Sequence, residues 1–321
     1  MDARAHVHLL QISPRPASPS PPRIVDTLSH CPLCQGGRFR PFRTCRDHTV
    51  SGESFDIVEC KACGFRFTNP RPSADALEQY YESEDYTPHQ ATSQGLTDTL
   101  YRAVRFYTLR SKHRLIASLV SDPSSRLLDF GCGTGEFLNL CQSRGWAARG
   151  LEPDPTAQKV ATQKYGLMVD TPDQIQTLPD DHFDVITLWH VLEHVPELLE
   201  TVEQLKRTLA PEGTLVVAVP NCTAFDAQFY GEYWAAYDVP RHLYHFRPGD
   251  VRRLFDQKSM TVTDIRPMRL DAFYVSLLSE QYRNGWLLRA PLVALYSILW
   301  AARHEHRHSA QLYLIRHEDV A

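Results

Sequence analysis

From residue 124 onwards, short apolar runs alternate with segments in which apolar side chains recur every three or four positions. The runs predict buried strands and the periodic segments predict helices between them. Strands are expected at 126–131, 147–153, 167–170, 183–189, 213–220, 261–268 and 310–317, and helices at 136–145, 155–166, 196–210 and 248–259. Apolar strands flanked by helices are buried on both faces, so the pattern predicts an α/β fold, a Rossmann-like doubly wound, mostly parallel seven-stranded sheet.

The rest of the chain divides by composition. Residues 1–28 are rich in Pro and Ser and are expected to be a disordered leader. A small cysteine-bearing module follows at 29–72, then a helical linker and N-terminal cap at 73–123. Within the large domain, 124–321, we expect an aromatic lid at 222–247 and a helical insertion at 271–308.

Composition excludes some classes of protein. A hydrophobic fraction of 43% supports a real core, and a formal charge of -4 disfavours nucleic acid as the main partner. No N-terminal segment resembles a secretory signal, and no apolar stretch reaches the ~20 residues that span a bilayer. We therefore expect a cytoplasmic protein.

The stretch "LLDFGCGTGEF" joins the first strand to the first helix through Gly131, Gly133 and Gly135. Glycines there let a ligand approach the backbone. A dinucleotide fingerprint would carry a third glycine where this chain has Glu136, and carboxylates at Glu136 and Asp129 suit a cation rather than a pyrophosphate. Glu152 ends the second strand, where an acid binds ribose hydroxyls. The expected ligand combines a nucleoside with a positive charge, as S-adenosylmethionine does.

Five motifs in order, among them "LLDFGCGTGEF", "GLEPD" and "FDVITLWHVLEHV", resemble the class I S-adenosylmethionine-dependent methyltransferases. The resemblance implies that the first-strand acid and glycine turn hold the methionine part and that the second-strand acid holds the ribose. It also implies adenine contacts after the third strand and cofactor contacts after the fourth. The implied cofactor residues are Asp129, Gly131, Cys132, Gly133, Gly135, Glu152, Asp173, Gln174, Trp189 and His190.

Two Cys-x-x-Cys pairs, Cys31 with Cys34 and Cys60 with Cys63, have the spacing of a four-thiolate zinc site. Four thiolates leave no open coordination position, so the expected Zn²⁺ is structural. A redox or unpaired role is the alternative. The other cysteines are expected to be packing residues.

The sequences "CPLC", "CKACGFRFTNPRPS", "LEQYYESEDY" and "YDVPRHLYHF" together resemble bacterial zinc-ribbon methyltransferases of surface-polysaccharide or secondary-metabolite pathways. That similarity implies that Tyr86 lies over the cofactor. For Tyr80 and Tyr81 the sequence leaves two roles open, which are contact with the cofactor and packing of a helix against the sheet.

The lid segment contains the candidate catalytic histidines, His245 and His242, because it follows the fifth strand at the carboxyl edge of the sheet. Arg241 is a candidate clamp for an anionic substrate, with Tyr237 and Tyr244 beside it. The alternative is that the aromatic side chains are core, that the histidines bond backbone carbonyls, and that Arg241 forms a salt bridge.

The apolar stretch 286–302 ends in a cluster of His and Arg. A packed or dimer-forming helix and a peripheral membrane contact both fit it. Three functions follow from the sequence: methyl transfer to a small molecule, such as a sugar, a nucleotide- or lipid-linked sugar or a secondary metabolite; RNA methylation with the zinc module gripping RNA; and a non-catalytic cofactor-binding scaffold.

Overall fold

The computed structural model of the chain describes residues 25–81, 96–122 and 124–318, and for residues 75 and 96–104 it describes the backbone alone. Tyr86 and residues 1–24 of the expected leader lie outside the described residues.

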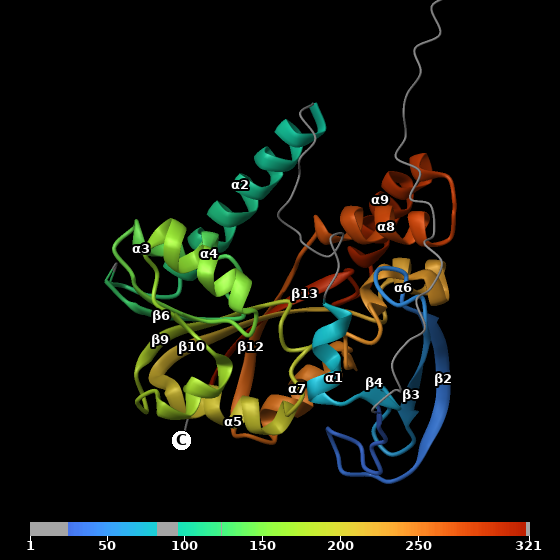
Figure 1. Cartoon of the computed structure of the whole chain (residues 1–321), viewed down its shortest axis with the longest axis horizontal. Helices are drawn as coiled ribbons and strands as arrows, with labels where there is room; N and C mark the ends of the chain where they lie inside the picture. The colour runs from blue at the N-terminus through green and yellow to red at the C-terminus, as the bar shows by residue number, and fades with distance from the viewer. Residues whose placement is uncertain (1–24, 82–95, 123, 319–321) are drawn as a thin grey trace, which may run out of the picture.

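The central sheet is built from seven strands. They are β6 Arg126–Phe130, β7 Ala147–Leu151, β8 Val169–Asp170, β9 Phe183–Trp189, β10 Leu209–Pro220, β12 Met260–Pro267 and β13 Ala310–His317. Their order is β12-β13-β10-β9-β6-β7-β8 (Figure 1). Strand β13 runs antiparallel to both of its neighbours, whereas β6 to β10 pair in parallel. The predicted mostly parallel, doubly wound seven-stranded sheet is confirmed.

Helices cover both faces of this sheet (Figure 1). On one face lie α2 Leu96–Ala117, α3 Glu136–Gln142 and α4 Pro155–Tyr165, and on the other α5 Leu198–Thr208 and α7 Pro248–Asp256. Local sequence sets their ends. Asp154 caps α4 by accepting a hydrogen bond from the Thr156 amide at 2.8 Å, and Gly166 ends it at a φ of 67°.

The cysteine-bearing module is a second, antiparallel sheet. Its strands β2 Phe39–Arg46, β3 Ser54–Cys60 and β4 Arg66–Thr68 are joined by β11 Tyr244–His245 in the order β11-β4-β3-β2. The predicted lid therefore supplies one strand to the module. In addition, β1 Val25–Asp26, inside the expected leader, pairs with β5 Arg71–Pro72. Residues 25 and 26 of the expected leader are thus paired with the end of the module.

Two short segments connect the module to the sheet domain. Helix α1 Ala74–Leu77 continues as a 3-10 turn at Glu78–Tyr80. The lid contains α6 Phe225–Tyr230 and 3-10 turns at Gly231–Tyr233 and Ala235–Tyr237. Its Trp234 and Tyr237 pack in one buried cluster with Phe55 and Ile57 of the module. The lid aromatics are thus largely core.

The insertion between β12 and β13 forms two helices that pack against each other, α8 Asp271–Tyr282 and α9 Ala290–Ala301 (Figure 1). Across the described part of the chain, no helix has both the length and the hydropathy needed to cross a membrane.

Candidate functional site

The glycine turn follows β6 and leads into α3, and all three of its glycines have positive φ. A Cβ on Gly131 would lie 2.4 Å from the Val191 Cγ2 atom, so this position requires glycine for packing as well as for conformation. Around Gly133 a Cβ would meet nothing within 4 Å. The turn therefore offers open backbone at Gly133, where a ligand can approach.

Two buried carboxylates flank the turn. Asp129 ends β6, is 2% exposed and accepts a hydrogen bond from the Thr187 hydroxyl at 2.6 Å. Glu152, after β7, accepts hydrogen bonds from the Gly133 amide at 2.7 Å and the Asp154 amide at 3.0 Å. Burial raises the pKa of Asp129 to about 7 and also raises the pKa of Glu152. A cation bound between these carboxylates would favour their charged forms and so offset the loss of solvation that burial causes.

Helix α2 brings two cationic side chains to the same region. The sequence analysis did not identify either of them. The Lys112 ammonium lies 4.3 Å from the centre of the Trp189 ring and in the field of Asp129. Arg105 forms an ion pair with Glu136 at 2.6 Å. Arg105 compensates the charge of Glu136 and Lys112 part of the charge of Asp129, so the preference for a cationic ligand rests on Glu152 and on the charge of Asp129 that Lys112 leaves uncompensated.

The other residues that the resemblance implies for cofactor binding differ in their surroundings. Cys132 is buried in the turn and packs against β7, where a Cβ on Gly150 would lie 2.6 Å from its sulfur. Asp173 and Gln174 lie in a 3-10 turn after β8 and hydrogen-bond to each other at 3.1 Å. Trp189 packs edge-on against Phe137. The structure thus brings Trp189 to the start of α3, directly after the turn, and places Asp173 and Gln174 in hydrogen bonds within their own 3-10 turn, which also include Thr177.

His190 directly follows β9 with a positive φ of 58°. Its Nε2 atom lies 3.0 Å from the Asp271 carboxylate and its Nδ1 atom 3.5 Å from the Glu193 carboxylate. Burial opposes protonation, but the hydrogen bonds from Asp271 and Glu193 outweigh it and raise the pKa of His190 above its usual range. His190 therefore links α8 to Glu193.

Glu193 is a functional candidate that the sequence analysis missed. Its side chain is fully buried, and apart from the 3.5 Å contact between Oε1 and His190 Nδ1 neither carboxylate oxygen has a hydrogen-bond partner among the described residues. Its ligand atoms and those of His194 and His242 lie within 4.8 Å of one another, so the three side chains could also hold a metal ion. The motif "HVLEH" was the available signal, because it places an acid between two histidines.

The two histidines of this cluster are oriented by the backbone. His242 Nδ1 lies 2.8 Å from the Ala236 carbonyl, and His194 Nδ1 lies 3.1 Å from the Arg241 carbonyl and 2.9 Å from the Tyr81 hydroxyl. Burial, with the field of His242, lowers the pKa of His194 to about 4. Burial raises the pKa of Tyr81, and among charged groups Asp238, Glu193 and Glu152 raise it further. The charges of this cluster and of Glu152 thus both act on Tyr81.

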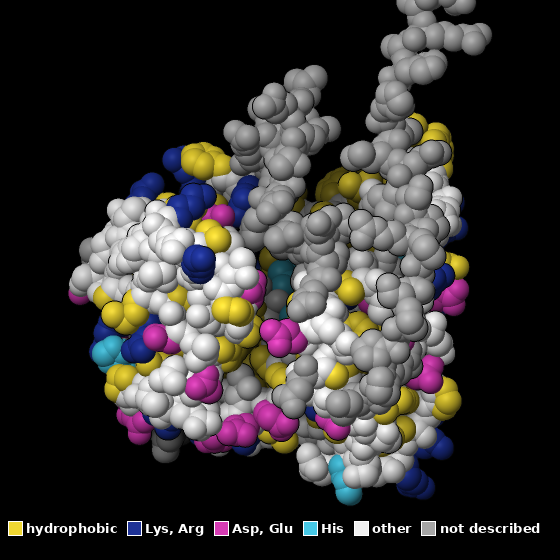
Figure 2. All heavy atoms as spheres, viewed as in Figure 1, with side chains coloured by type: hydrophobic (Ala, Val, Ile, Leu, Met, Phe, Trp, Pro, Cys, Tyr) yellow, Lys and Arg dark blue, Asp and Glu magenta, His cyan; other side chains and the backbone are white. Residues whose placement is uncertain are grey.

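The space-filling view shows a hollow between the sheet domain and α1, with histidine atoms at its floor and acidic side chains at its rim (Figure 2). We call Glu193, His194 and His242 the Glu-His cluster.

His245, the other candidate base, is packed inside the module sheet. It is 3% exposed, pairs with Arg66 across β11 and β4, and its Nε2 atom lies 3.2 Å from the Thr68 hydroxyl. Burial lowers the pKa of His245 well below its usual range. These contacts are those expected of a packed core histidine, the alternative to a catalytic role.

The predicted substrate residues also lie in the joint between lid and module. The Arg241 guanidinium is 1% exposed and bonds Asp47 at 3.0 Å and Asp238 at 2.6 Å. Tyr244 donates its hydroxyl to the Pro196 carbonyl at 2.8 Å, and Tyr237 packs edge-on against His245. These contacts are those of the alternative, in which Arg241 forms salt bridges and the aromatic side chains are core.

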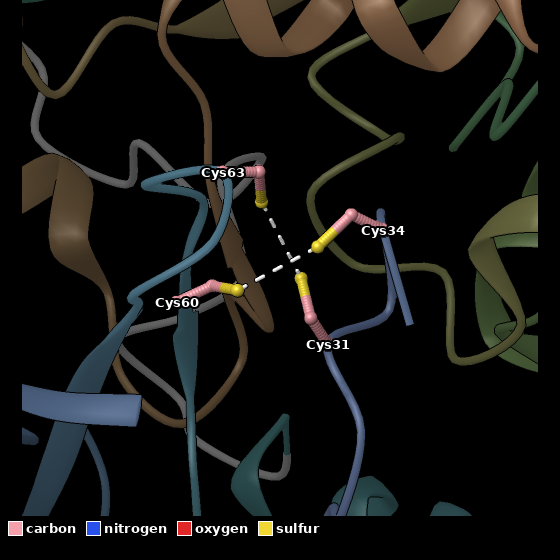
Figure 3. Close-up of side chains that lie close together, drawn as sticks. All are labelled: Cys31, Cys34, Cys60 and Cys63. Carbon is pink, nitrogen blue, oxygen red and sulfur yellow. Dashed lines mark hydrogen bonds between the residues drawn. The ribbon is translucent and has the colours of Figure 1, made fainter. Parts of the chain in front are cut away.

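The four cysteines of the module converge from two knuckles (Figure 3). The Cys31 and Cys63 sulfurs are 3.7 Å apart and the Cys34 and Cys60 sulfurs 3.6 Å apart. Zn–S bonds of ~2.3 Å in a tetrahedron place sulfurs about 3.8 Å apart. The donor set and its spacing fit a tetrahedral zinc ion.

Comparison with known proteins gives a family. A family model described as "Methyltransferase domain" matches residues 101–263. A ubiquinone biosynthesis O-methyltransferase of Xanthomonas campestris pv. campestris is 28% identical over 181 residues, which are 53% of this chain and 72% of the relative. A malonyl-(acyl-carrier protein) O-methyltransferase of Serratia marcescens is 30% identical over 138 residues, or 42% of this chain and 53% of the relative.

Among solved structures, a SAM dependent methyltransferase from Archaeoglobus fulgidus aligns with a TM-score of 0.46 and 19% identity, over 66% of this chain and 93% of that chain. Since the family model spans half of the sequence and includes the glycine turn, both buried carboxylates and Glu193, the chain belongs to the methyltransferase-domain family and is an S-adenosylmethionine-dependent methyltransferase.

Proposed function

We propose that the protein methylates a hydroxyl oxygen of a small-molecule acceptor, which binds in the hollow beside the Glu-His cluster. The observation that carries this proposal is the convergence of the buried Glu193 carboxylate with two backbone-oriented histidines next to the cofactor side of the sheet. The two relatives named above are O-methyltransferases, which supports oxygen as the acceptor atom.

The cofactor would be held by Asp129, Glu152 and the open backbone at Gly133. When bound, S-adenosylmethionine supplies an activated methyl group on a sulfonium. The chain's own contribution is to orient the acceptor, exclude water and take up the proton that a hydroxyl loses.

His242 is the proposed proton acceptor. Only an N–H can donate to the Ala236 carbonyl, so in the neutral ring Nδ1 carries the hydrogen and Nε2 carries the lone pair. Glu193 then lies where its negative charge stabilises the imidazolium that forms. His194 and Tyr81 position the cluster through their mutual hydrogen bond.

We also propose that Zn²⁺ binds Cys31, Cys34, Cys60 and Cys63 as a structural ion. The four sulfurs leave no free coordination position for chemistry. The site fixes the module whose sheet receives β11, and thus fixes the lid segment that carries His242.

The test is methyl transfer from radiolabelled S-adenosylmethionine to an extract separated into small molecules, lipids, protein and RNA. We expect label in the small-molecule or lipid fraction. Label in RNA would instead support the RNA methyltransferase, and no label in any fraction would support the scaffold.

Two variants locate the chemistry. His242→Ala should lower turnover by about 10²–10⁴-fold with unchanged affinity for S-adenosylhomocysteine. His245→Gln is the matched control, since it alters a buried histidine three positions away and should retain turnover. The reverse result would assign the base to His245.

A further inference from the structure

Helices α8 and α9 form a hairpin whose large apolar side chains face solvent. Among the described residues, sixteen large hydrophobic side chains are exposed, and ten of them lie between Leu270 and Leu299. A monomeric soluble protein rarely gathers so many in one place. The hairpin therefore presents a surface that needs a partner.

The exposed side chains follow helical spacing. On and just before α8 they are Leu270, Phe273, Tyr274 and Leu277, and on and just before α9 they are Leu288, Leu292, Leu295, Tyr296 and Leu299. Positions three or four apart share one face of a helix. Each helix thus carries one continuous apolar stripe, and Trp286, which is 66% exposed, lies in the turn between them. We call these ten residues the apolar hairpin face.

The opposite sides of the helices, which contact the protein, carry small or polar residues. Ala272, Ser276 and Ser279 of α8 and Ala294 and Ser297 of α9 are buried. Their hydroxyls hold the hairpin in place. The Ser297 hydroxyl donates to the Asp226 carboxylate at 2.7 Å, and the Ser279 hydroxyl accepts from the Ala235 amide at 2.9 Å. This amphipathicity is inverted relative to an ordinary surface helix, whose apolar side faces the core.

One end of the hairpin is basic. Arg269 precedes the α8 stripe, and the exposed Arg303 continues the α9 stripe one turn beyond Leu299. His308 follows in the same segment, and burial, with the fields of Arg269 and His306, lowers its pKa. The only acid in the segment 302–309 is Glu305, and the acids of α8 are engaged with His190 and Arg289.

From this arrangement we propose that the apolar hairpin face docks on an anionic membrane surface. Leucine, tyrosine and tryptophan side chains would enter the interface, and the arginines at the basic end would meet acidic headgroups. One apolar stripe per helix, bordered by arginines at one end, complements a lipid surface with negatively charged headgroups.

A second copy of the chain fits this surface less well. A two-fold interface offers this patch only its own side chains, and the α8 acids Asp271 and Glu280 are already paired with His190 and Arg289, so they do not compensate the arginines at the basic end. Residues 82–95, which the structure does not describe, read "ESEDYTPHQATSQG" and contain almost no apolar side chains that could cover ten large ones.

The docking surface is connected to the proposed active site. Asp271, the first residue of α8, bonds His190, which contacts Glu193. We therefore infer, on the basis of the proposed function, that the acceptor is amphiphilic. Its apolar part would stay in the membrane while its hydroxyl reaches the Glu-His cluster.

The test is co-sedimentation of the full chain with vesicles of phosphatidylcholine alone and of phosphatidylcholine with phosphatidylglycerol. We expect binding to the anionic vesicles. This binding should weaken when KCl is raised to about 0.5 M, because salt at that concentration screens surface charges. Leu292→Asp combined with Leu295→Asp should lower the partition coefficient on the order of a hundredfold. Arg303→Ser should lower it about fivefold.

Met168→Asp is the matched control, because Met168 is 61% exposed but lies beside β8, at the edge of the sheet opposite β12. It should bind vesicles like the unmodified chain. Equal binding by the double aspartate variant, or no binding by the unmodified chain, would overturn the proposal. A dimer in light scattering that the double variant dissociates would assign the face to a second copy.

S-adenosylhomocysteine affinity is measured on every variant. A chain that binds this ligand but no vesicles refutes the membrane surface alone. A chain that binds vesicles but not this ligand refutes the proposed function alone.

Discussion

Replacing Arg241 with methionine should remove the main electrostatic connection between the module and the lid. The guanidinium bonds Asp47 of the module and Asp238 of the lid, and it also donates to the Tyr80 carbonyl at 3.0 Å. Arg241 and Asp47 are almost completely buried. Methionine keeps much of the length of the side chain but leaves both carboxylates without their cation.

The size of the effect follows from burial. Removing one partner of a buried ion pair costs about 3–5 kcal/mol, because the remaining charge stays in a medium of low polarity. An exposed pair contributes about 0–1 kcal/mol. Arg40, whose side chain is 64% exposed, pairs with Glu59 in the same module and gives a matched control.

Urea denaturation measures both variants. Arg241→Met should lower the free energy of unfolding by about 3–5 kcal/mol and Arg40→Met by less than about 1 kcal/mol. Adding Asp238→Asn to Arg241→Met should cost less than the sum of the two single changes, because the second change removes a charge already left unpaired. A loss below about 1 kcal/mol for Arg241→Met would refute the buried connection.

Three further predictions concern the cofactor site, pH and zinc. Glu152→Gln should weaken S-adenosylhomocysteine binding by about 1–3 kcal/mol in calorimetry, and unchanged affinity would exclude Glu152 from the ribose site. Because the pKa of His245 is held well below its usual value, the unfolded chain takes up a proton near pH ~6.5 that the folded chain refuses. The free energy of unfolding should therefore fall as the pH drops below about 6.5. His245→Gln should make this dependence on pH less steep, and an identical pH dependence would contradict the lowered pKa of His245. If Zn²⁺ binds the four cysteines as proposed, Cys60→Ser should lower the zinc content in elemental analysis and lower the melting temperature, whereas unchanged zinc content would argue against the four-sulfur site.

Local sequence was sufficient to predict the central sheet. Each of its seven strands was anticipated within a few residues, because apolar runs and helical periodicity are properties of neighbouring positions. Asp129 and Glu152 could be found for the same reason, since each ends a strand whose position the pattern predicts.

The joint between lid and module could not be predicted in this way. Strand β11 has only two residues and pairs with β4, which lies more than 170 positions earlier in the chain. Arg241, Tyr237 and His245 were placed in a substrate site because they follow the fifth strand, but sequence does not show which side of the chain faces the hollow. For Glu193 the motif "HVLEH" was a signal that the sequence analysis did not use, and the full burial of its carboxylate, which marks it as a candidate, is a tertiary property.

The most direct test of the account is calorimetric titration of the purified chain with S-adenosylmethionine and, separately, with NADH. If the buried Asp129 and Glu152 carboxylates set the polarity of the pocket, S-adenosylmethionine should bind at one site and NADH should give no heat of binding. Saturable NADH binding with no response to S-adenosylmethionine would contradict it.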